Sequence, residues 1–366
     1  MFYDDELQAI KKANRLRNRV IFDDNLVDLA SNDYLGLSKN KKLLKKAYQT
    51  TKKELYQSPR ASMLVNGYSK IHKLFEDKLK ELHNFEDAIV VGSGFLANIS
   101  LFESLARKKD LFLIDEEYHA SGILASKLSM AKVQFFRHND ISHLKELIST
   151  NQEFKRIIIA IEGVYSMSGG LPKKEIFDIA DEYNAILIVD EAHSSGVLGE
   201  KLLGIFDYYQ IKPKPNHIKM GTLGKAYGSY GAYILASNEI ISFLVNRAKP
   251  IIYSTAPSIF DTALGYHTLE YIQKKSTKLR KKIDTNIKKL NKVFNQQNNS
   301  LIFTIPVKTN KKVLQLQQEL KNKGFLVGAI RQPTVNQPIL RIIPNLGIKK
   351  RFLKDFVEKF THLSGE

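Results

Sequence analysis

AILIVDEAHSSG, residues 185–196, shows the pattern that decides the fold. An apolar run rich in β-branched residues ends in Asp190, and His193 follows a few positions later. Such a run is typical of a strand buried on both faces, as in a parallel sheet covered by helices. A carboxylate at the buried end of a strand is costly unless a positive partner reaches it. We therefore expect Asp190 to face a cation at the edge of a sheet.

Similar apolar runs recur on both sides of this segment and alternate with helical patterns. Further strands are predicted at residues 88–92, 111–115, 133–136, 156–163, 217–221 and 231–237, and helices at 40–56, 69–84 and 96–108. Strands that alternate with helices favour an α/β fold with a mostly parallel sheet. We expect an N-terminal arm over residues 1–40 and a large α/β domain over 41–255. Residues 256–366 should form an interdomain helix and a small C-terminal α+β domain with a helix at 310–323.

The composition places the chain among ordinary globular proteins. It has 366 residues, of which 43% are hydrophobic and 26% charged, and it has no cysteine. The absence of cysteine excludes disulfides, thiolate metal sites and cysteine nucleophiles. No apolar run approaches the roughly 18–20 residues that span a bilayer, and the N-terminal stretch has no apolar signal core. We therefore expect a cytoplasmic enzyme without a membrane partner.

The net charge is +18 and the sequence pI is about 9.6. Such a balance favours an anionic partner, such as a nucleic acid, an anionic lipid or an acidic carrier. Lysine-rich clusters at residues 39–46 and 274–282 equally fit solvated helix faces. The charge alone therefore does not identify a partner.

Polar or small residues follow five of the predicted strands. These positions are Gly92–Phe95, His119, Glu162–Ser166, Asp190–His193 and Thr222–Lys225. In open α/β sheets, ligands bind beyond the carboxyl ends of the strands. We therefore expect these five segments to form one pocket.

The residue types in this pocket favour pyridoxal phosphate. Lys225 lies among glycines in GTLGKAYG, where a bare ammonium is poorly placed, so we expect it to join a cofactor aldehyde covalently. The helix that begins at Gly94 and Phe95 offers free N–H groups to a phosphate, and Thr222 adds a hydroxyl. Asp190 can hold the ring nitrogen protonated, so that the ring withdraws electrons from a substrate carbanion. His193 can reach the ring oxygen, and His119 can stack on the ring and later transfer a proton.

Two alternative hypotheses are that the chain is a helicase or another nucleic-acid-binding protein. The DEAH letters also mark a class of helicases, which needs an upstream G-x-x-x-x-G-K-[ST] loop. The only Gly-Lys pair, Gly224–Lys225, lies downstream of DEAH, with Lys219 in place of the first glycine and Ala226 in place of Ser or Thr. A basic nucleic-acid-binding protein with a decayed catalytic fold would show salt-sensitive binding to nucleic acid and no yellow colour. We expect no nucleic-acid partner.

Many short motifs along nearly the whole chain carry a resemblance to a known family. They are LRNR, SNDYLGLS, NGYSKIHKLFEDKL, GSGFLANIS, HAS, FFRHNDISHL, EGVYSMSG, DEAHSSGVLG, GTLGKAYGSYGAY, YSTAPS and AIRQPTV. In this order they resemble the α-oxoamine synthases, which are fold-type I pyridoxal-phosphate enzymes. Within that family the chain looks most like the members of biotin biosynthesis, which condense L-alanine with a pimeloyl thioester, carried on coenzyme A or acyl carrier protein, and release CO2.

The resemblance implies a role for each matching residue. Lys225 would join the cofactor, Asp190 would meet the ring nitrogen, His193 the ring oxygen and His119 the ring face. The remaining cofactor contacts would be Gly94, Phe95, Ser166 and Thr222, together with Ser254 and Thr255 of a neighbouring subunit in an obligate homodimer. Contacts to the acyl substrate and product would come from Arg17, Asn32 and Thr334, and Arg341 would bind the amino-acid carboxylate.

Some positions depart from the family pattern. Tyr118 precedes HAS where the family often has Asn or Ser, and MSGG at 167–170 replaces MDGD. R-I-I follows PTV where R-x-R is usual, so only Arg341 remains for the carboxylate. The sister enzymes glycine C-acetyltransferase, 5-aminolevulinate synthase and serine palmitoyltransferase share the cofactor residues and stay as alternatives.

Overall fold

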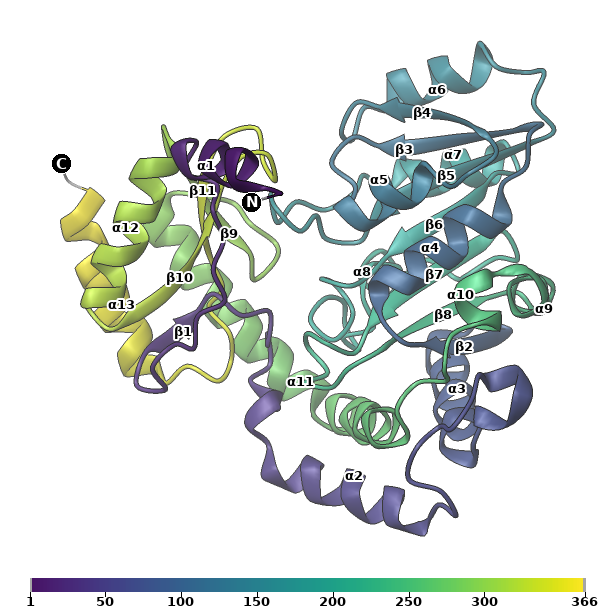
Figure 1. The fold of residues 1–366 in the computed structure, drawn as a ribbon, viewed down its shortest axis with the longest axis horizontal. Coiled ribbons are helices and arrows are strands. Elements are labelled where there is room, and N and C mark those ends of the chain that lie inside the picture. Colours follow the sequence, from purple (N-terminus) through teal and green to yellow (C-terminus); the bar gives the residue numbers. More distant parts are fainter. Residues whose placement is uncertain (1, 365–366) are drawn as a thin grey trace. The chain divides into compact units, whose positions relative to one another are not determined.

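The structure of this chain is a computed structural model that describes residues 2–364 (Figure 1). The chain forms two compact units. The larger unit contains Leu35–Ser166 and Gly170–Lys281, and the smaller one contains Met1–Tyr34, Met167–Gly169 and Lys282–Glu366. The residues before Tyr34 therefore belong to the same unit as the C-terminal part of the chain.

A seven-stranded sheet forms the centre of the larger unit. Its strands, in spatial order, are β2 (Asp87–Val91), β8 (Ala232–Ala236), β7 (His217–Thr222), β6 (Ile186–Asp190), β5 (Arg156–Glu162), β3 (Asp110–Asp115) and β4 (Lys132–Phe136). The five strands from β7 to β4 are mutually parallel, whereas β8 runs antiparallel to both of its neighbours. The prediction of a mostly parallel sheet is confirmed.

Helices separate most of these strands along the chain, as the sequence pattern predicts. Those of the larger unit are α2 (Lys41–Lys53), α3 (Lys70–His83), α4 (Gly94–Leu105), α5 (Ala120–Ser126), α6 (Ile141–Ser149), α7 (Glu175–Glu182), α8 (Ile205–Tyr209), α9 (Asn238–Arg247) and α10 (Lys249–Ile252). The long helix α11 (Ile259–Phe294) begins in the larger unit and ends in the smaller one. A short 3-10 helix (Leu37–Lys39) and a π-helical turn (Met63–Gly67) complete the larger unit.

The core of the larger unit lies between the sheet and α4. Phe112 of β3, Ile188 of β6 and Ile218 of β7 are fully buried, and they pack in one cluster with Leu101 and Phe102 of α4. The β-branched residues of β5 and β6 are buried along nearly the full strand, because both faces of the sheet are covered. This burial leaves the strand ends as the places where polar side chains can meet a ligand.

The smaller unit contains a four-stranded sheet in the order β1 (Val27–Leu29), β10 (Phe325–Ile330), β11 (Ile339–Ile342) and β9 (Phe303–Pro306). Strand β1 is parallel to β10, so the N-terminal segment is anchored to the C-terminal part through backbone pairing. The helices of this unit are α1 (Asp4–Lys12), α12 (Asn310–Asn322) and α13 (Lys350–Ser364). No helix among residues 2–364 is long and apolar enough to cross a membrane.

Candidate active site

A cavity of about 210 Å³ lies at the carboxyl ends of the central strands of the larger unit. It is lined by Gly94, Phe95, Asn98, His119, Ser121, Glu162, Asp190, Ala192, His193, Met220, Thr222 and Lys225. Most of these residues come from the five strand exits that the sequence marks as unusual, and the others come from α4, α5 and the end of β7. The fold therefore brings seven predicted site residues into one cavity: Gly94, Phe95, His119, Asp190, His193, Thr222 and Lys225.

Lys225 reaches this cavity from the turn that follows β7. Its Nζ lies 2.8 Å from Nε2 of His193, which comes from the turn after β6. The next residues, Ala226 and Tyr227, are almost completely buried and anchor the turn in the core. An amine held on an anchored turn beside an imidazole can react with a carbonyl group and can exchange protons with it.

Asp190 is buried at the end of β6 and accepts two hydrogen bonds from neutral groups. Its Oδ2 accepts from Asn98 Nδ2 at 3.0 Å, and its Oδ1 accepts from the Ala192 backbone N–H at 3.0 Å. The Asn98 amide also donates to Ser121 Oγ at 2.8 Å, and its Oδ1 accepts from the Tyr118 hydroxyl at 2.9 Å. Both N–H groups and the carbonyl oxygen of Asn98 are therefore hydrogen-bonded, and Asn98 fixes the Asp190 carboxylate in the cavity wall.

His119 caps the N-terminus of α5 with its ring. Nδ1 accepts from the Ser121 backbone N–H at 3.2 Å and lies 2.7 Å from Ser121 Oγ. Burial lowers the pKa of His119; the negative charge of Asp190 opposes this shift, and the positive charge of Lys225 adds to it. Since Nδ1 is an acceptor, the neutral ring carries its proton on Nε2, where it can be transferred to a ligand.

The first turn of α4 supplies donors for an anion. Ser93 is the N-cap, and its Oγ accepts from the Leu96 N–H at 3.2 Å. The first N–H groups of a helix have no acceptor within it and lie at the positive end of its dipole, so Gly94 and Phe95 can bind a phosphate. Thr222 lies beside them, since its side chain would be the nearest contact of a Cβ at Gly94. The donor set of the cavity thus fits pyridoxal phosphate: a phosphate site, a carboxylate, an imidazole and an amine.

A buried ion pair supports the cavity from behind. Lys219 of β7 is fully buried, and its Nζ lies 3.1 Å from Glu191 Oε1 and also donates to the Leu203 carbonyl. The other oxygen of Glu191 accepts from Ser194 Oγ and from the Ile205 N–H, the latter at 2.7 Å. These bonds hold the turn that carries Asp190 and His193.

Gly163 fits against the same cluster. A Cβ at this position would come within 2.5 Å of Ser194 Oγ and 3.0 Å of Glu191 Oε2. Only glycine therefore allows the chain that leaves β5 to pass this closely, which places the neighbouring Glu162 in the cavity wall.

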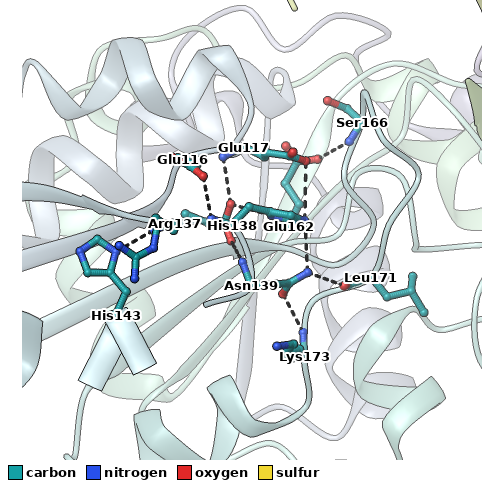
Figure 2. A network of polar contacts seen from close by, with 11 residues as sticks. Glu116, Glu117, Arg137, His138, Asn139, His143, Glu162, Ser166, Leu171 and Lys173 are labelled. Carbon is teal, nitrogen blue, oxygen red and sulfur yellow. Dashed lines mark hydrogen bonds and ion pairs between the residues drawn. The ribbon is translucent and has the colours of Figure 1, made fainter. Parts of the chain in front are cut away.

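The segment after β5 is held by a polar network (Figure 2). The Ser166 N–H donates to Glu162 Oε2 at 2.9 Å, and Asn139 bridges the Leu171 carbonyl and the Lys173 N–H, each at 2.9 Å. His138 lies 3.0 Å from Asp115 Oδ1 and supports Asn139. Ser166 is buried in this network but does not line the cavity.

The other predicted site residues do not line the cavity. Ser254 and Thr255 follow α10, and the Thr255 side chain is exposed. In the smaller unit, Arg17 donates to Thr334 Oγ1 at 3.2 Å, and Arg341 donates to Asn32 Oδ1 at 2.9 Å. Arg341 is buried and also donates to the Tyr34 hydroxyl at 3.4 Å. The four predicted substrate contacts of this unit thus form two hydrogen-bonded pairs.

Three polar lining residues had no predicted role: Asn98, Ser121 and Glu162, the last of which lies in a segment expected to border the pocket. Asn98 is a buried amide within an otherwise apolar helical stretch, and such a residue requires partners. Ser121 follows His119 closely in the HAS motif, and Glu162 ends a strand, as Asp190 does. The sequence signal that identifies these residues is a polar side chain at the end of a predicted strand or near the start of a mostly apolar helix.

Comparison with known proteins places these observations in a family. Residues 24–360 match the family model described as aminotransferase class I and II. The chain is 44% identical over 357 residues to an 8-amino-7-oxononanoate synthase of Helicobacter pylori. The aligned region covers 97% of this chain and 95% of the relative. It is 35% identical to a putative 8-amino-7-oxononanoate synthase of Aquifex aeolicus, with 97% of each chain covered.

Solved structures give the same fold. The 8-amino-7-oxononanoate synthase of Francisella tularensis superposes with a TM-score of 0.77 at 27% identity, over 93% of this chain and all of the other. A serine palmitoyltransferase variant from S. paucimobilis with a bound PLP–myriocin aldimine superposes with a TM-score of 0.89 at 19% identity, over 98% of this chain and 96% of the other. The latter likeness concerns the fold alone.

Proposed function

We propose a reaction for this chain from the premise that it belongs to the class I and II aminotransferase family and, within it, with the 8-amino-7-oxononanoate synthases. It is a pyridoxal-phosphate-dependent acyltransferase that condenses L-alanine with a pimeloyl thioester. The products are 8-amino-7-oxononanoate, CO2 and the free thiol of the carrier. The name of the relatives supplies the substrates, and the cavity supplies the chemistry.

One observation carries the proposal: a single cavity holds the Lys225 amine, the Asp190 carboxylate and the phosphate site at the start of α4. Lys225 would bind the cofactor aldehyde covalently through Nζ. Asp190 would hold a proton on the ring nitrogen, and His193 would donate to the ring oxygen. The Gly94 and Phe95 amides and Thr222 would bind the phosphate. When bound there, pyridoxal phosphate supplies the sink for the electrons of a carbanion at the substrate Cα.

Two side chains of the protein, Lys225 and His119, would transfer the protons of the reaction. Lys225 Nζ, when it is free, would be the base that removes the Cα proton of L-alanine. His119 is neutral and carries its proton on Nε2, so it can donate this proton when CO2 leaves.

Further parts of the proposal rest on the resemblance to α-oxoamine synthases. Arg17, Asn32, Thr334 and Arg341 would contact the substrates, with Arg341 as the carboxylate ligand. Ser166 would contact the cofactor. A cytoplasmic homodimer is proposed, in which Ser254 and Thr255 serve the neighbouring subunit. The positive net charge suits an anionic pimeloyl thioester of coenzyme A or acyl carrier protein.

The experiment that tests this function combines covalent trapping with substrate choice. Wild-type protein incubated with pyridoxal phosphate should turn yellow, and borohydride reduction should leave the cofactor mass on the peptide that contains Lys225. Lys225→Ala should show neither signal. Turnover should be fastest with L-alanine and a pimeloyl thioester. Preference for glycine with acetyl- or succinyl-coenzyme A, or for serine with palmitoyl-coenzyme A, would assign the chain to a sister reaction.

A further inference from the structure

The Glu162 carboxyl group has an unusual environment in this cavity. It is 1% exposed and lies at the end of β5, among the cavity-lining residues. Its Oε2 accepts the Ser166 N–H at 2.9 Å, as Figure 2 shows, whereas its buried Oε1 has no hydrogen-bond partner among the described residues. An unpaired buried carboxylate oxygen is costly. An ionised Oε1 lacks a donor here and a protonated Oε1 lacks an acceptor, so a bound ligand would supply the missing partner.

Asp190 is the neighbour that decides which carboxyl group keeps the negative charge. Glu162 and Asp190 are paired in register at the ends of the adjacent parallel strands β5 and β6. Two neighbouring buried carboxyl groups do not ionise together without cost, and the one with more donors holds the charge better. Asp190 accepts two hydrogen bonds, from Asn98 and Ala192, whereas Glu162 accepts one.

On balance, the surroundings of Glu162 favour its neutral form. Burial raises the pKa of Glu162 well above its usual range, and the charge of Asp190 raises it further. The positive charge of Lys225 and the hydrogen bond from Ser166 oppose this rise without cancelling it.

We propose that Glu162 enters the cavity as a neutral carboxylic acid, which accepts the Ser166 N–H through Oε2 and donates from Oε1 to an oxygen atom of the bound cofactor. This contact rests on the proposed function, since pyridoxal phosphate is the ligand concerned. It would add a neutral donor to a cavity whose other ionisable groups are the Lys225 amine, two imidazoles and the Asp190 carboxylate. A neutral donor can bind a ring oxygen without repelling its negative charge.

Glutamine at this position reproduces the neutral acid and distinguishes it from an anion. Its carbonyl oxygen can accept the Ser166 N–H while its amide donates into the cavity. A carboxylate, by contrast, would accept at both oxygens, and Gln would fail to replace it. Glu162→Met removes the donor and the acceptor while keeping an unbranched side chain.

The test measures the dissociation constant of pyridoxal phosphate for the wild type, Glu162→Gln and Glu162→Met by absorbance titration. We expect Glu162→Gln to bind within about twofold of the wild type and Glu162→Met to bind about tenfold more weakly. Glu76→Gln is the matched control, because Glu76 is also buried but lies outside the cavity. Thermal unfolding of each variant shows whether it is folded.

An infrared spectrum of the cofactor-free protein tests the proton itself. It is recorded above pH 7, the value to which burial raises the pKa of Glu76, so that this second carboxyl group is ionised. A protonated-carboxyl band that disappears in Glu162→Gln and persists in Glu76→Gln supports the proposal.

Three results would overturn it: no such band, equal weakening in Glu162→Gln and Glu162→Met, or wild-type affinity in Glu162→Met. Wild-type protein that takes up no pyridoxal phosphate would instead overturn the proposed function and the contact with it.

Discussion

Two consecutive carboxylates, Asp190 and Glu191, lie at the end of the same strand in different surroundings. Glu191 pairs with the buried Lys219 at 3.1 Å and also accepts bonds from Ser194 and the Ile205 N–H. Asp190 lines the cavity, and the groups that donate to it, the Asn98 amide and the Ala192 N–H, are both neutral. Of these two consecutive residues, Glu191 therefore has its charge paired within the protein, whereas Asp190 can still pair with a ligand.

The difference shows how this sheet edge separates stability from chemistry. Glu191 has its own cation, so its charge is compensated before any ligand binds, and it fixes the turn. Asp190 is oriented by dipoles alone, so a cationic ring nitrogen can still add a favourable interaction there. A lysine beside Asp190 in the place that Lys219 occupies beside Glu191 would remove this capacity.

The largest effect is expected from Asp190→Asn. The amide cannot hold a proton on the ring nitrogen, so turnover should fall by about 10³-fold or more, while the cofactor is still bound through Lys225. Steady-state kinetics and the visible spectrum would measure the two effects separately. Glu191→Gln is the matched control at the next position, where we expect a loss of stability with the cofactor spectrum unchanged. Equal activity losses in the two variants would show that the two carboxylates do not have separate roles.

Lys219→Met is expected to act on folding. It leaves the Glu191 carboxylate buried without its cation, and breaking one side of a buried ion pair costs about 3–5 kcal/mol of unfolding free energy. Denaturant unfolding of the cofactor-free protein measures this loss. The double variant Lys219→Met with Glu191→Leu should recover part of it, because no unpaired charge remains. If Lys219→Met alone were as stable as the wild type, the ion pair would not be what holds this turn.

The sequence predicts the fold well where local pattern and burial agree. The apolar runs at residues 111–115, 156–163 and 185–190 correspond to β3, β5 and β6 within one or two residues. Their polar exits converge because parallel strands place their carboxyl ends at one edge of a sheet. The pocket follows from this single geometric rule, and the residue types at its edge then limit the ligand.

Contacts between distant segments are not readable from such patterns. Lys219 lies inside an apolar strand, and no local signal names Glu191 as its partner across the sheet. The bond between Asn98 and Asp190 joins a helix to a strand that is distant in sequence. Strand β1 was not predicted, because three residues are too few to show the apolar pattern by which a strand is recognised. These features depend on tertiary packing, which a single sequence does not specify residue by residue.

The smallest effect is expected from Tyr118→Phe, which tests how firmly Asp190 is oriented. The Tyr118 ring is buried against Phe102, so phenylalanine should fit the same space. Loss of the hydroxyl leaves Asn98 Oδ1 without its donor, which should cost about 1–2 kcal/mol of unfolding free energy. Asn98 also donates to Asp190 and Ser121, so its loosening should disturb both residues slightly. Turnover should therefore fall, but by a much smaller factor than in Asp190→Asn. Denaturant unfolding and kinetics measure both effects. Unchanged stability would mean that Asn98 is held by its other two bonds, and that the residue before His119 can vary without affecting the site.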